Sequence, residues 1–261
     1  MDLQIAGRRA VVLASSKGLG LAIARQLAAE GAHPLLVGRD ENRLRVEAER
    51  ITAHGAGQAS YVVADLGQPG AVDTIAEAAE RLGPVDLLVN NSGGPPPGTT
   101  SQMTTELLQR QADTMVFPLI AMTNRLLPGM RERGFGRILT IASSGVQQPI
   151  PNLALSNTLR AALHGWSKTL AAEVAGEGVT VNMLLPGRIA TDRLEELDQA
   201  AAKRTGKAVE DVRESARAGI PAGRYGTPEE FASVATFLLS GPAAYVTGTT
   251  VRCDGGLVRG V

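Results

Sequence analysis

Residues 153–173, LALSNTLRAALHGWSKTLAAE, carry an amphipathic pattern that predicts one helix. Ser156 and Arg160 lie four positions apart in this segment, so they share one face of that helix. The guanidinium of Arg160 keeps its charge at neutral pH, and it can bind sugar hydroxyls or stabilise negative charge that develops on an oxygen. A serine hydroxyl is a far weaker acid than a phenol, so Ser156 can assist a proton transfer only through water. The pair therefore predicts a site that polarises an oxygen without a strong acid of its own.

A glycine-rich turn follows the first apolar run of the chain, in the sequence ASSKGLGLAIARQLAAEGA. Gly18 and Gly20 stand between that run and an apolar helical face. Glycines in this position let the backbone approach a pyrophosphate at a helix N-terminus. The turn is therefore predicted to bind a dinucleotide through Ser16, Lys17, Gly18, Leu19 and Gly20.

The residues after the second apolar run bear on the choice of nucleotide. An acidic residue there would hydrogen-bond a ribose 2′-hydroxyl, whereas a guanidinium suits a 2′-phosphate. Arg39 follows Gly38 directly, and Lys17 is expected to reach the same place. Both favour NADP(H) over NAD(H), although Asp40 keeps the second possibility open, and either basic residue can also be an ordinary surface charge.

Short apolar runs alternate with longer helical patterns along the whole chain. This alternation is typical of a parallel sheet that is covered by helices on both faces, that is, a Rossmann-type doubly wound α/β fold. The loops at the carboxyl ends of the strands then gather the functional segments at one edge of the sheet. The expected strands are 10–15, 34–38, 59–66, 86–92, 136–143, 179–187 and 249–256.

One domain is expected over residues 1–261, because no repeat or low-complexity run divides the chain and 44% apolar residues suffice for one core. Residues 192–223 are polar and helix-prone, with no strand pattern. We expect them to form a mobile helical flap beside the site.

Charge and composition narrow the classes of partner. Lys plus Arg and Asp plus Glu number 26 each, so no net field attracts nucleic acid or an anionic membrane. The apolar runs are too short to span a bilayer, and the N-terminus lacks a signal-peptide layout, so a cytoplasmic location is expected. The single cysteine, Cys253, is expected to be a small core residue, and three scattered histidines suggest no metal site. Small molecules and further copies of the chain remain as partners.

Longer motifs make the sequence similar to the short-chain dehydrogenase/reductase family over nearly its whole length. These motifs are NNSG at 90–93, GRILTIASS at 136–144, VTVNMLLPGRIATD at 179–192 and GRYGTPEEFASVATFLLSGPAAYVTGTTVRCDGG at the C-terminus. The resemblance is strongest to 3-oxoacyl-[acyl-carrier-protein] reductases, specifically to atypical members with a GGPPPG loop, here 93–98. It implies hydride transfer between a nicotinamide cofactor and an alcohol or carbonyl, and assembly as a homotetramer.

The resemblance also implies the cofactor contacts. Asp65 and Leu66 would contact the adenine, and Arg160 the nicotinamide ribose. The segments after the fourth and sixth strands would line the middle of the cofactor and clamp the nicotinamide; their residues are Asn91, Ser92, Gly93, Pro186, Gly187, Ile189 and Thr191.

Several positions depart from the family pattern. Ala14 replaces the first glycine of the turn, and the turn can accommodate its methyl group if its φ angle stays negative. Of the catalytic Asn, Ser, Tyr and Lys, only the serine is retained, as Ser143; the other three positions hold Met115, Ser156 and Arg160.

Two hypotheses follow from these departures. In the first, the chain is an NADP(H)-dependent oxidoreductase in which Ser143 and Arg160 polarise a carbonyl oxygen and Ser156 assists through water. In the second, it is a catalytically inactive nucleotide-binding or regulatory protein that keeps the fold. Loss of a positioned general acid would lower the rate by about 10² to 10⁴, which leaves a slow enzyme possible.

Two other parts of the chain offer a substitute for the missing acid. His164 and Lys168 repeat the four-residue spacing, but the helix would have to slide about 12 Å to present them. Tyr225 could bring a phenol to the site from the end of the flap, although packing at the base of the flap explains it more simply.

Overall fold

The computed structural model describes residues 1–260 and builds them around one seven-stranded parallel sheet. The strand order is β3-β2-β1-β4-β5-β6-β7. Strands β2 and β3 are added on one side of β1, and strands β4 to β7 are added on the other side. The strands are β1 (Arg9–Val12), β2 (His33–Gly38), β3 (Ser60–Val63), β4 (Val85–Asn90), β5 (Gly136–Ile141), β6 (Val179–Pro186) and β7 (Thr250–Cys253). The predicted doubly wound α/β fold is confirmed, and each predicted strand is present. β1, β2 and β4 begin one residue earlier than predicted, and every strand except β2 ends earlier than predicted.

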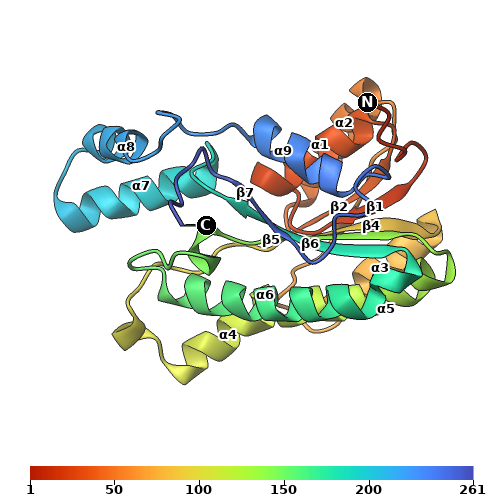
Figure 1. The fold of residues 1–261 in the computed structure, drawn as a ribbon, viewed down its shortest axis with the longest axis horizontal. Helices are drawn as coiled ribbons and strands as arrows, with labels where there is room; N and C mark the ends of the chain where they lie inside the picture. The colour runs from red at the N-terminus through yellow and green to blue at the C-terminus, as the bar shows by residue number, and fades with distance from the viewer. Residues whose placement is uncertain (261) are drawn as a thin grey trace.

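Helices cover both faces of the sheet (Figure 1). The first layer comprises α1 (Gly18–Ala29), α2 (Glu41–His54) and α9 (Pro228–Leu238). The second comprises α3 (Ala71–Leu82), α4 (Thr105–Met115), α5 (Phe117–Glu132) and α6 (Ala154–Val174). Two apolar cores result, one on each face, which is why the inner strands are apolar almost without interruption: all six residues of β5 are buried.

Helix α6 matches the predicted segment within one residue at each end. It buries Leu155, Leu159 and Leu163, spaced four apart, against the sheet. Ser156 and Arg160 are buried on the adjoining side of the same helix, one turn apart as predicted. The helix therefore carries its candidate site residues at its first turns, next to the carboxyl edge of β5.

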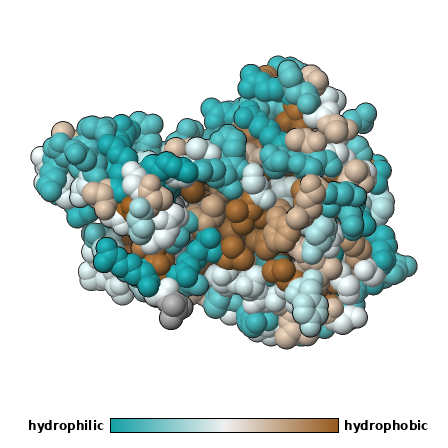
Figure 2. Space-filling model, turned by 45° about the horizontal axis from the view of Figure 1, so that its top comes forward, coloured by the Kyte–Doolittle hydropathy of each residue, from teal (hydrophilic) through white to brown (hydrophobic). Residues whose placement is uncertain are grey.

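The predicted flap is helical. It forms α7 (Asp192–Thr205) and α8 (Val209–Ala218), which project together from the carboxyl side of the sheet (Figure 1). Figure 2 shows them as a mainly hydrophilic lobe beside a hollow. Thr191 caps α7 by accepting a hydrogen bond from the backbone N–H of Leu194. Its role as a substrate flap stays a prediction.

The turn at Ala14 differs from expectation. Its φ is 48°, in the left-handed region, so the condition of a negative angle is not met. This conformation costs a non-glycine residue roughly 1–2 kcal/mol. Neighbouring hydrogen bonds hold it: Asn91 Nδ2 donates to the Ala14 carbonyl over 3.1 Å, and the Ser15 N–H donates to the Val37 carbonyl over 2.8 Å. The turn forms despite the methyl group because both ends are tied to strands.

Two kinds of feature are absent from residues 1–260. No group of three or more His, Cys, Asp or Glu residues within 1–260 gathers to hold a metal ion. No helix of that range is long and apolar enough to cross a membrane.

Candidate active site

The N-terminus of α1 is arranged to receive an anion. It has no side-chain cap and no acidic residue in its first turn, so its first N–H groups remain available. Gly20 is required there, because a Cβ at this position would lie 2.6 Å from the Ala14 carbonyl oxygen and 2.9 Å from Asn91 Nδ2. The turn comes close to the start of the loop after β4, and its glycines carry no side chain. A pyrophosphate could therefore approach the backbone of this turn.

The end of β2 favours a phosphorylated ribose. Arg39 is exposed and lies 3.9 Å from Asp65. Asp40 is used elsewhere, because its carboxylate accepts the Arg43 N–H and caps α2. The Asp40 carboxylate, which could have bound a ribose 2′-hydroxyl, therefore caps a helix instead. Lys17 points across the cleft instead of joining Arg39, and its Nζ lies 3.1 Å from Asp192 at the start of α7.

The loop after β4 borders the same cleft. Asn91 faces the glycine turn, as described, and Ser92 donates to the Gly93 carbonyl over 3.3 Å. A Cβ on Gly93 would meet nothing within 4 Å, so the chain here lies beside open space. Leu66, after β3, packs partly buried against the core under this loop.

Ser143 and Arg160 both lie at the carboxyl end of β5. The guanidinium of Arg160 donates from NH1 to the carbonyl of Ile141 over 2.8 Å, which ties α6 to the last residue of that strand. Ser143 follows two residues later, is partly exposed, and its Oγ accepts the Gly145 N–H over 3.1 Å. Ser156 is 8% exposed, one turn before Arg160. The structure therefore brings the three predicted catalytic residues to one edge of the sheet.

The charge of Arg160 is buried without a carboxylate. Its exposed fraction is 8%, and the ion pairs of residues 1–260 include none for this guanidinium. Burial, and after it the positive charge of Arg193, together lower the pKa of Arg160 to about 10. Because that pKa stays well above neutrality, the group remains a cation at pH 7. Such a charge is costly to bury alone and is strongly attractive to negative charge that develops nearby.

The loop after β6 forms the far wall of the cleft. The Gly187 N–H donates to the Cys253 carbonyl over 3.0 Å, and a Cβ on Gly187 would lie 2.5 Å from Asp254 Cα. Ile189 pairs with Gly226 in an isolated bridge. Pro186 ends β6, and Thr191 starts α7. The segment predicted to clamp the nicotinamide is thus fixed by backbone contacts on both sides.

Both first residues of α7 reach across the cleft. Asp192 pairs with Lys17 of the glycine turn, and Arg193 donates from NH2 to the Pro95 carbonyl over 2.6 Å. Arg193 also lies against Gly94, where a Cβ would come within 3.0 Å of its guanidinium nitrogens. The flap therefore touches the site from two sides.

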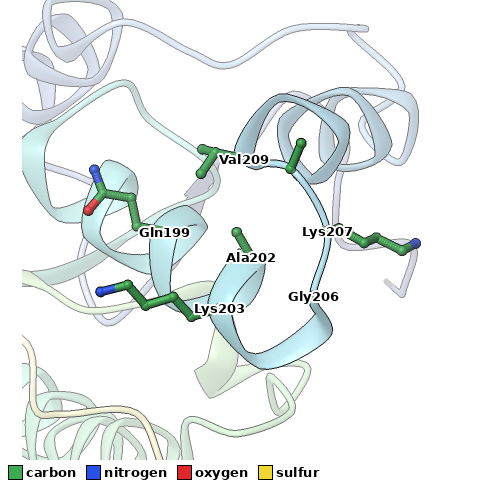
Figure 3. A pocket seen from close by; sticks show the side chains of 7 residues that line it. Gln199, Ala202, Lys203, Gly206, Lys207 and Val209 are labelled. Carbon is green, nitrogen blue, oxygen red and sulfur yellow. The ribbon is translucent and has the colours of Figure 1, made fainter.

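The hollow drawn in Figure 3 lies elsewhere, between α7 and α8. Its volume is about 540 Å³, and Lys203 and Lys207 are the charged residues of its lining. The two lysines extend away from each other, so they present no common binding point (Figure 3).

Comparisons with known proteins agree with this geometry. Residues 13–258 match the family model described as enoyl-(acyl carrier protein) reductase. A monensin polyketide synthase putative ketoacyl reductase of Streptomyces virginiae is 34% identical over 97% of this chain and 98% of its own length. The 3-oxoacyl-[acyl-carrier-protein] reductase of Escherichia coli K12 is 33% identical over 96% and 97%. The chain belongs to the short-chain dehydrogenase/reductase family.

A solved structure of the family superposes over the full length. L-sorbose reductase of Gluconobacter frateurii, in complex with NADPH and L-sorbose, has a TM-score of 0.93 and 34% identity, with 100% of both chains covered. The family resemblance inferred from the motifs is thereby confirmed, as is the fold. The individual site residues stay predictions.

Met115 fills core in this chain, as its residue type suggests. It is 2% exposed, ends α4 and packs in the apolar cluster beneath β4. Cys253, expected to be a small core residue, is half-buried against the opposite core. Burial raises the pKa of its thiol, so it is no activated nucleophile.

Neither substitute acid is free to act. Lys168 donates to the Gly248 carbonyl over 2.9 Å, so the pair with His164 faces the loop before β7. Tyr225 donates its hydroxyl to Asp198 Oδ2 over 3.0 Å, and Arg188 donates to Oδ1 over 2.7 Å. Burial and the bond to Asp198 raise the pKa of Tyr225, which makes it a weaker acid. The residue anchors the base of the flap.

Two residues of the site had no sequence signal. Asp198 is 2% exposed and holds Arg188 and Tyr225 together, yet it lies in a stretch that looks like a solvated helix. Arg193 lies in the same stretch. Only the contact of α7 with the loop after β4 reveals its place.

We expect Tyr225→Phe to leave kcat within about twofold and to lower the free energy of unfolding by about 1–2 kcal/mol, because one hydrogen bond to a buried carboxylate is lost. Steady-state kinetics and urea denaturation measure the two effects. Tyr245→Phe, at a fully exposed position, is the matched control and should change neither. A large fall in kcat with unchanged stability would instead identify Tyr225 as the proton donor.

Proposed function

We propose that the chain is an NADPH-dependent reductase that acts on a carbonyl substrate, with Arg160 in place of the usual lysine and no phenol acid. The buried, unpaired guanidinium of Arg160 at the carboxyl edge of β5 carries this proposal. Related proteins support the reaction class, since they include ketoacyl reductases and an NADPH-bound sugar reductase.

The residues present fit the cofactor. The uncapped start of α1 suits the pyrophosphate, and Arg39 suits a 2′-phosphate because Asp40 is engaged in capping. Asp65, Leu66, Asn91, Ser92 and Gly93 would hold the adenine side and the middle. Pro186, Gly187, Ile189 and Thr191 would hold the nicotinamide. When bound, NADPH supplies the hydride.

The protein stabilises the oxygen of the reacting carbonyl. Arg160 keeps hydrogen-bond donors beyond the one that Ile141 accepts, and its charge lies where negative charge would develop. The Ser143 hydroxyl donates a second hydrogen bond to the same oxygen. A water that the Ser156 hydroxyl positions passes a proton to the reduced oxygen and is reprotonated from bulk solvent, while Arg160 keeps its own proton and its charge.

Retention of a buried cation argues against the inactive alternative. A buried charge without a partner costs several kcal/mol of desolvation. An apolar side chain of similar volume would relieve this cost at a position that had lost its role.

The first prediction concerns Arg160→Met. We expect kcat to fall about 10²- to 10³-fold, because a donor to the developing oxyanion is removed. We expect the free energy of unfolding to stay equal or rise, because an uncompensated buried charge is removed. Stopped-flow oxidation of NADPH over a carbonyl panel and urea denaturation measure these quantities. Ser143→Ala should lose rate in the same direction.

Arg110→Met, on the exposed side of α4, is the control for the loss of an arginine. The inactive alternative is supported if the wild type shows no turnover while a variant with Met115→Asn, Ser156→Tyr and Arg160→Lys does. Equal losses of rate and stability in Arg160→Met would assign the residue a structural role.

A second prediction concerns pH. With the pKa of Arg160 at about 10 and no other acid in the site, kcat/KM should be flat from about pH 6 to 9. It should fall as pH rises through about 10, because the guanidinium then loses its proton and its charge. Rates measured across this range test the prediction. A change of kcat/KM near about pH 6.5 would reveal a histidine in the proton transfer and contradict this prediction.

A homotetramer, the assembly expected from the family, is proposed as well. Apolar side chains are exposed in the middle of the face shown in Figure 2, beside the flap. Phe117 on α5 is 50% exposed and Phe237 on α9 is 38% exposed, which suits burial between subunits. Light scattering should give four times the chain mass of 27.2 kDa. A monomeric mass would refute the assembly. A cytoplasmic location stays a prediction.

A further inference from the structure

Arg193 lies where it could bind a second, charged group of the substrate. It belongs to the first turn of α7 and crosses the cleft to the loop 93–98. That loop leaves β4, whose last residue, Asn90, pairs with Thr140 of β5. Ile141, the acceptor for Arg160, is the next residue of β5. Both guanidiniums therefore lie near the loop that follows β4.

The two arginines share a local excess of positive charge. Arg160 has no ion pair among residues 1–260, and the nearby charge that acts on it is that of Arg193, which is also positive. Arg193 has one partner, Glu196, whose Oε2 lies 3.2 Å from NH1 and whose side chain is 57% exposed. A solvated carboxylate of this kind offsets only part of the charge. More than one net positive charge is therefore left around the two guanidiniums.

The guanidinium of Arg193 is held in a fixed position. Its NH2 donates to the Pro95 carbonyl over 2.6 Å, and its plane lies against Gly94, where a side chain would displace it. Its side chain keeps 38% exposure. Each terminal nitrogen of this fixed guanidinium keeps a second hydrogen, so the group can donate to a carboxylate, and it loses little entropy on binding.

We propose that the substrate is an oxo acid, whose carbonyl oxygen binds Arg160 and Ser143 while its carboxylate binds Arg193. This inference rests on the proposed function for the role of Arg160. Arg193 is thus a residue that determines specificity, and it selects free acids over neutral esters. The negative charge of the substrate offsets the excess of positive charge between the two arginines.

The test uses two matched pairs: acetoacetate with methyl acetoacetate, and pyruvate with methyl pyruvate. Calorimetry measures their binding to the full chain loaded with NADP⁺, which cannot reduce a carbonyl, so binding is measured without reaction. In at least one pair, wild type should bind the acid at least tenfold more tightly than the ester. Arg193→Gln should abolish this preference and leave ester binding within about twofold.

Two further variants separate charge from structure. Arg193→Lys keeps the positive charge but loses the paired donors of the guanidinium, so it should retain part of the preference for the acid. Arg204→Gln, at an exposed position in the last turn of α7, should retain all of it. An equal or absent affinity for acid and ester in both pairs overturns the proposal, as does an undiminished preference in Arg193→Gln. Selective binding of the acid without turnover by NADPH would instead refute the proposed reductase and leave the carboxylate site standing.

Discussion

The site depends on a single hydrogen bond, from the buried guanidinium of Arg160 to the carbonyl of Ile141. This bond joins the first turns of α6 to the end of β5 and places a cation at the edge where the cofactor loops converge. A lysine has a point charge on a flexible stem, whereas a guanidinium can donate to the strand with one nitrogen and to a ligand with others. The exchange of residue type therefore preserves charge at the site and adds a fixed orientation. The cost is a buried cation that forms no ion pair with any carboxylate of residues 1–260.

The nucleotide side of the cleft is also built under constraint. Ala14 adopts a left-handed conformation that a glycine would adopt without strain, and the chain retains it because Asn91 and Ser15 bind the turn from both sides. Gly20 tolerates no substitute, because its neighbours are a backbone oxygen and the amide of Asn91. The same amide thus ties the turn to the loop after β4, where the cofactor of the family crosses the sheet.

The flap is attached at three points, and each is polar. Asp198 receives Arg188 and Tyr225 at its base, while Asp192 and Arg193 reach the glycine turn and the GGPPPG loop. Polar contacts of exposed residues break at a small cost in free energy, whereas the buried carboxylate of Asp198 is expensive to leave unpaired. The base at Asp198 is therefore the strongest of these attachments.

The sequence by itself determined the sheet, the glycine turn, the helix that carries Ser156 and Arg160, and the departures from the family tetrad, because these depend on periodicity and on spacing within one element. It also showed that Tyr225 was a poor candidate for the acid. Only the tertiary structure decided that Asp40 caps a helix, that Lys17 faces Asp192, and that Ala14 is left-handed. The same holds for Arg193 and Asp198, since their partners lie far away in the chain or across the cleft. Local pattern specifies which face of a helix is buried, but it contains no information on which distant loop that face will meet.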